Sequence, residues 1–174
     1  MDFIYENNIC NIYIDHVNQI EDGYKKCISI MKQFIRNKEI YFMVYRDDGI
    51  NINDLDMTKE EVDKYIIGNG SIITYINSYS YCGYLLNKDK TWVVLPSISK
   101  WYLDSSFFDL NKSIDQFKDF YMDNHMERYA KYIKSGFASI IFSFLDSGDF
   151  CVSFDADKHS VESIKESLKK EGLL

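Results

Sequence analysis

The residues with the best spacing for nucleophilic chemistry lie close together near the C-terminus: Cys151, Asp155, Asp157 and His159. A catalytic cysteine needs a neighbouring cation or a helix N-terminus to lower the pKa of its thiol, and a base within hydrogen-bond reach. Cys151 alternates with apolar residues in a strand pattern, and nearby carboxylates raise the pKa of a thiol. We therefore expect Cys151 to be a packed thiol, and a small hydrolase with a site assembled around Cys151 and His159 stays open as the enzymatic alternative.

The other residue types that do chemistry show no spacing typical of a site. The histidines His16, His125 and His159 are isolated, without the H-E-x-x-H or paired Cys/His spacing of a zinc site. The segment 68–71 lacks the third glycine of a dinucleotide fingerprint and the Gly-Lys of a P-loop, and the acids between 47 and 56 depart from the calcium-loop pattern. Among 27 acids a catalytic carboxylate pair stays open, but no motif indicates one. The sequence thus predicts no catalytic residue, no metal site and no cofactor.

Acidic and aromatic side chains are the remaining candidates for function, as a surface that binds a partner. Aspartates are frequent in the second half of the chain, and the 14 tyrosines include several in one predicted strand region. Tyr and Trp anchor protein interfaces, and clustered carboxylates speed the encounter with a basic partner. The alternative that strand tyrosines are half-buried and hairpin aspartates serve turn geometry stays open. The predicted partner-binding residues are Tyr81, Trp101, Asp104, Asp109, Asp146, Asp149, Asp155 and Asp157.

Hydrophobic periodicity predicts the elements that would position these residues. Apolar residues at three-and-four spacing predict a helix from Ile20 to Ile35 with a cap-like start at Asn18. Further helices are predicted over 58–66, 113–133 and 160–170, and the segment 97–111 is predicted to be irregular. Strand patterns cover 11–17, 39–46, 71–78, 79–86, 91–95, 137–145 and 150–154.

Hairpins outnumber alternating strand–helix units in this order of elements, which is typical of an α+β fold. We expect a single domain over residues 1–174, with a mainly antiparallel sheet of about five to six strands packed with three to four helices. No linker or repeat divides the chain.

Composition and charge restrict the class of partner and the compartment. The chain is 46% hydrophobic and 16% aromatic, which excludes intrinsic disorder. Acids outnumber bases 27 to 20, for a net charge of -7, so we expect a basic protein partner and no nucleic acid. The acidic N-terminus, the lack of a long apolar stretch and four scattered cysteines predict a cytoplasmic protein with reduced thiols and no membrane span.

In overall character, the chain is similar to small bacterial immunity proteins. Those proteins are often acidic, lack catalytic motifs and come from A/T-biased loci, and the excess of Lys over Arg here indicates A/T-rich codons. The resemblance implies that the chain binds and neutralises a basic toxin domain in the cytoplasm without catalysis. A viral or bacterial adaptor that acts on host proteins would show the same surface and stays open, and the sequence indicates no oligomeric state.

Overall fold

The computed structural model describes part of the chain. The described residues are 3–6, 8–36, 40–45, 74–76, 79–86, 92, 105–113, 115–117, 119–120, 129–145 and 147–174. The predicted helix over 58–66 lies outside these residues, as do all of the predicted strand 91–95 except Trp92, which is helical rather than extended.

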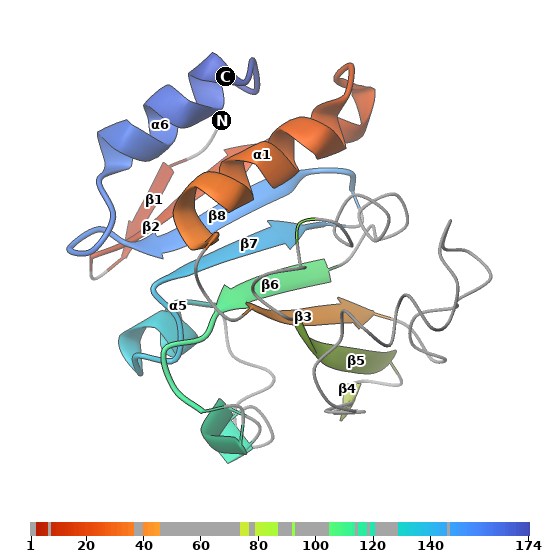
Figure 1. Ribbon diagram of the computed structural model, residues 1–174, viewed down its shortest axis with the longest axis vertical. Helices are drawn as coiled ribbons and strands as arrows, with labels where there is room; N and C mark the ends of the chain where they lie inside the picture. Colours follow the sequence, from red (N-terminus) through yellow and green to blue (C-terminus); the bar gives the residue numbers. More distant parts are fainter. Residues whose placement is uncertain are drawn as a thin grey trace.

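One eight-stranded sheet organises the described residues, in the order β1-β2-β8-β7-β6-β3-β5-β4 (Figure 1). Every neighbouring pair is antiparallel, so the predicted α+β fold with an antiparallel sheet is confirmed, whereas the strand number exceeds the predicted five to six. The strands are β1 (Phe3–Glu6), β2 (Ile9–Ile14), β3 (Ile40–Tyr45), β4 (Thr74–Ile76), β5 (Tyr79–Leu86), β6 (Ser105–Asp109), β7 (Ile140–Phe144) and β8 (Phe150–Asp155).

Two strands were not predicted from the pattern. β1 is a four-residue strand at the N-terminus, and β6 falls in the segment that was predicted to be irregular. β6 contains two serines and an aspartate, which are typical of loops, yet all five of its residues are buried between β3 and β7. Because both faces of this strand are covered, its sequence has no polar–apolar alternation to reveal it.

Helices cover both faces of the sheet. Among the described elements, α1 (Gly23–Ile35) and α6 (Val161–Lys170) share one core with the inward residues of β2, β7 and β8, and Figure 1 shows the two helices over the same side of these strands. The short α5 (Tyr129–Lys134) packs with Phe108 and Ile141 in a second core on the opposite face. Of the predicted helix over 113–133, residues 115–117, 119–120 and 129–133 are helical. None of the described helices is long and apolar enough to cross a membrane.

A tight connection joins β2 to α1. The 3-10 turn η1 (Val17–Gln19) occupies the predicted start of the helix, so α1 begins at Gly23 rather than at Ile20. The backbone of Gly23 lies so close to η1 that a Cβ atom there would collide with the carbonyl oxygen of Val17. The first residue of α1 must therefore be glycine for η1 and α1 to pack in this way.

We predict that Gly23→Ala destabilises the protein by about 2 kcal/mol or more, although alanine normally stabilises a helix by about 1 kcal/mol relative to glycine. Urea denaturation followed by circular dichroism measures the change. Gly172→Ala is the matched control, because Gly172 has a φ of +70° but its Cβ would meet nothing closer than Lys26 Nζ at 3.9 Å. The control should cost about 1 kcal/mol, from backbone conformation alone. A Gly23→Ala protein as stable as the wild type would contradict the described packing.

Candidate functional site

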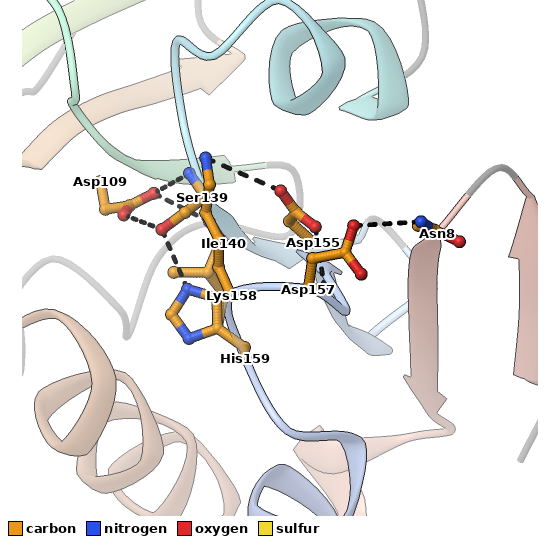
Figure 2. A network of polar contacts seen from close by, with 8 residues as sticks. All are labelled: Asn8, Asp109, Ser139, Ile140, Asp155, Asp157, Lys158 and His159. Carbon is orange, nitrogen blue, oxygen red and sulfur yellow. Dashed lines mark hydrogen bonds and ion pairs between the residues drawn. The ribbon is translucent and has the colours of Figure 1, made fainter.

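A buried carboxylate at the end of β6 is the centre of the polar network in Figure 2. Asp109 is 1% exposed, and one of its oxygens accepts hydrogen bonds from the backbone N–H groups of Ser139 (2.8 Å) and Ile140 (2.9 Å). Its other oxygen accepts the hydroxyl of Ser139 at 2.6 Å. Such charge-assisted bonds compensate for the loss of water around a buried carboxylate, and here they fix the start of β7 against the end of β6.

His159 extends this network on the other side of Ser139. The Ser139 hydroxyl lies 2.9 Å from His159 Nε2. A hydroxyl has a single proton, and Ser139 donates it to Asp109, so the histidine Nε2–H must donate to the serine oxygen. The order is therefore Asp–Ser–His, whereas a catalytic triad requires the histidine to accept the serine proton and the carboxylate to hold the other ring nitrogen.

The turn after β8 ties this network to the neighbouring strands. Asp155 donates its backbone N–H to the carbonyl of Ser139, and its own carbonyl accepts from His159. The side chain of Asp155 accepts the N–H of Asp157 and lies 3.7 Å from Lys158 Nζ. Asp157 in turn accepts a hydrogen bond from the Asn8 side chain, at 3.0 Å, in the turn between β1 and β2 (Figure 2). These contacts join the ends of β2, β6, β7 and β8 into one rigid corner.

The predicted acidic residues do not form a single cluster. Asp155 and Asp157 lie at the corner described above, and Asp157 is exposed. Asp109 lies at the same corner, but its carboxylate is buried and bonded inside the protein, so it does not present its charge to a partner. Asp149 precedes Phe150 and therefore lies at the opposite end of β8.

At that opposite end, Asp149 holds the β7–β8 hairpin against the β2–η1 turn. Its carboxylate accepts the hydroxyl of Ser147 at 2.6 Å and the backbone N–H of His16 at 2.7 Å. These hydrogen bonds, with that of Ser147 the stronger influence, lower the pKa of Asp149. Asp149 is therefore partly buried, and it stabilises the fold as well as contributing negative charge to the surface.

The remaining predicted residues are only partly placed. Tyr81 lies on β5, where it is in register with Tyr45 of β3 and Thr74 of β4. Trp101, Asp104 and Asp146 lie outside the described residues.

The two residues of the alternative hydrolase site lie on different sides of the sheet. Cys151 is 2% exposed and alternates with Phe150 and Val152, which belong to the core under α1 and α6, so its side chain belongs to the other face. His159 contacts the ring of Phe34 on α1, with ring centroids 6.3 Å apart. Burial raises the pKa of the Cys151 thiol to about 11, which keeps it protonated near neutral pH.

Serines form a second polar group, which no pattern in the sequence predicts. On the face that carries Cys151, the Ser106 hydroxyl contacts those of Ser143 and Tyr129, and Ser153 donates to Asn11 at 2.6 Å. The signal available in the sequence was weak: Ser139 and Ser143 interrupt an otherwise apolar run. Such interruptions are also common on exposed strands, so only the sheet register shows that these hydroxyls bond to one another.

Within the described part of the chain, no group of three His, Cys, Asp or Glu residues could hold a metal ion. Comparison of the chain with family models, with curated proteins and with solved structures finds no match. The interpretation of the site therefore depends on its geometry.

We predict that Asp109→Asn lowers the free energy of unfolding by about 3 kcal/mol. The amide oxygen of the asparagine can still accept both backbone N–H groups, but without the negative charge, and its NH2 group would face the Ser139 hydroxyl that now donates to the second carboxylate oxygen. Urea denaturation measures the loss. Asp119→Asn removes the same charge at an exposed position and should change stability by no more than about 0.5 kcal/mol. Equal stabilities of the two variants would show that the Asp109 network does not hold the strands together.

We predict that iodoacetamide modifies Cys151 at pH 8 at least about 100-fold more slowly in the folded chain than in the denatured chain. A pKa about two units above that of an ordinary thiol reduces the reactive thiolate by that factor, and burial slows access further. Mass spectrometry of the peptide that contains Cys151 measures both rates. Modification that is faster in the folded chain would support the hydrolase alternative.

Proposed function

We propose that this chain is a non-enzymatic binding protein, and specifically a cytoplasmic immunity protein that binds and neutralises a basic toxin domain. The observation that carries the proposal is how the polar side chains are used. Among the described residues, Ser139, His159 and Cys151 make hydrogen bonds to neighbouring polar groups in buried or partly buried positions, whereas the Asp157 carboxylate is exposed.

Ser139, His159 and Cys151 are not arranged for catalysis. Ser139 is 7% exposed and donates to Asp109, so its hydroxyl is not activated by His159. Cys151 is buried on the other face, and its thiol remains protonated at neutral pH. A hydrolase built on Ser139 or Cys151 would need that group to be exposed and paired with a base.

The negative charge of the chain favours a basic partner. The chain carries a net charge of -7, and Asp157 is exposed beside the partly buried Asp155. Both side chains are held by hydrogen bonds or an ion pair to Asn8 and Lys158, so they are preorganised before a partner arrives. A preorganised carboxylate loses little conformational freedom on binding, which favours affinity for lysine and arginine side chains.

The partner class can be tested genetically and with a purified domain. The toxin domain encoded beside this gene should be lethal when expressed alone and harmless when this chain is coexpressed. Binding of the two purified proteins should weaken at least about tenfold between about 50 and 300 mM salt, since screening reduces attraction between surface charges. Salt-independent binding would contradict an electrostatic interface, and the absence of a neighbouring toxin gene would favour an adaptor that acts on another protein.

We predict that Asp157→Lys weakens binding to that toxin domain about tenfold, by replacing an exposed attractive charge with a repulsive one. Surface plasmon resonance measures the association rate and the Kd. Glu166→Lys makes the same change in net charge at an exposed position on α6 and should reduce affinity by no more than about threefold. If the two variants bind alike, net charge rather than the corner around Asp157 governs recognition.

A further inference from the structure

We propose that the outer edge of β1 is a docking strand, to which the partner adds an extended segment rich in lysine or arginine. This inference rests on the proposed function, because it names the part of the chain that a basic protein partner would contact. It places the interface at an edge of the sheet that lies next to the corner formed by Asn8, Asp155 and Asp157.

β1 is an edge strand. It lies at the end of the sheet, and among the described residues it pairs with β2 alone (Figure 1). In an antiparallel pair, alternate residues direct their backbone N–H and C=O groups away from the neighbour, so β1 presents donors and acceptors along its outer side. Such an edge is a template for another strand.

Within the described part of the chain, the edge of β1 has few of the features that block pairing with another strand. Natural edge strands are usually blocked by lysine, proline, a bulge or a covering element. The β1 sequence Phe-Ile-Tyr-Glu contains neither lysine nor proline, and its register with β2 runs from Phe3↔Ile12 to Glu6↔Ile9 without a bulge. Of the described elements, only β2 packs extensively along it. The edge at the other end of the sheet, β4, is three residues long and offers a shorter template.

The register of β1 with β2 indicates which side chains an added strand needs. Phe3 and Tyr5 are in register with Ile12 and Cys10, which are both fully buried in the core under α1 and α6. Directly opposed residues of an antiparallel pair share a face, so apolar residues of the added strand would extend this core at alternate positions. The intervening positions fall on the face that carries Glu6.

Negative charge at the end of β1 indicates that the added strand is basic. Glu6 ends β1 and is in register with Ile9, which is itself in register with Asp155 of β8. Asn8, two residues later, binds Asp157. Three acidic residues thus lie at this end of β1, and within the described part of the chain Lys158 is the cation that pairs with one of them. A lysine or arginine of the added strand placed near Glu6 would be attracted by this excess of negative charge.

A second copy of this chain fits the same edge less well. If two copies of β1 paired antiparallel, directly opposed residues would have to lie on the same face of the sheet. The twofold axis that relates the two copies would therefore pass through Ile4 or through Tyr5. An axis through Tyr5 would place Glu6 opposite the apolar Ile4 of the other copy. Either arrangement also brings together two chains that each carry a net charge of -7. A basic strand from another protein avoids both the pairing of Glu6 with an apolar residue and the repulsion between two acidic chains.

Hydrogen exchange of the full-length, nitrogen-15-labelled chain tests the proposal. The probe is a capped heptapeptide of alternating valine and lysine. We expect it to slow the exchange of outward amides in residues 3–6 at least about fivefold, with a Kd below about 1 mM. The same peptide with every residue N-methylated keeps its charge but has no backbone donors, and a peptide with glutamate in place of lysine keeps its donors but has the opposite charge. Neither should protect β1.

Glu6→Lys should weaken binding of the valine–lysine peptide at least about fivefold, whereas Glu162→Lys, at an exposed position on α6, should leave it unchanged within about twofold. Three results would overturn the proposal: no protection of residues 3–6 by the peptide, equal binding of the N-methylated peptide, or β1 amides already protected in a dimer of the free chain. None of these results affects salt-dependent neutralisation of the toxin domain, which tests the proposed function separately. Loss of neutralisation with β1 still binding the peptide would overturn the proposed function alone.

Discussion

The buried carboxylate of Asp109 imposes the strictest constraint on the described part of this structure. A charge removed from water costs several kcal/mol unless hydrogen bonds replace its hydration. Two consecutive backbone N–H groups and one hydroxyl do so here, and all three come from the start of β7. The geometry of β6, β7 and the turn after β8 follows from the need to keep these donors on one carboxylate.

This constraint also determines what the nearby polar groups do. Ser139 gives its proton to Asp109, and His159 completes the hydrogen bonding of the serine oxygen instead of withdrawing its proton. The turn that carries His159 also carries Asp155 and Asp157, so the same rigid corner that uses Ser139 structurally presents carboxylates outward. Under the proposed function, these carboxylates would contact a basic protein, and the outer edge of β1 would add backbone hydrogen bonds to that contact.

The amphipathic helices and some of the strands could be predicted from sequence, because α1, α6 and β8 each show a clear period over most of their length. β6 could not, since Ser105, Ser106 and Asp109 are typical of a loop until their partners are known. The donors to Asp109 lie 30 and 31 positions away, and no local pattern shows such a contact. For the same reason the acids from Asp109 to Asp157 looked like one surface, although one is buried and Asp149 lies at the far end of β8.

The proposed function requires that the chain act by binding and change no covalent bond in its partner. The decisive measurement is the activity of a toxin domain from a neighbouring gene while it is titrated with this chain. We expect a linear loss of activity that is complete at one equivalent of this chain, and recovery of fully active toxin of unchanged mass after separation in high salt. Inactivation of excess toxin by a small fraction of an equivalent, or a lasting change in its mass, would contradict the claim.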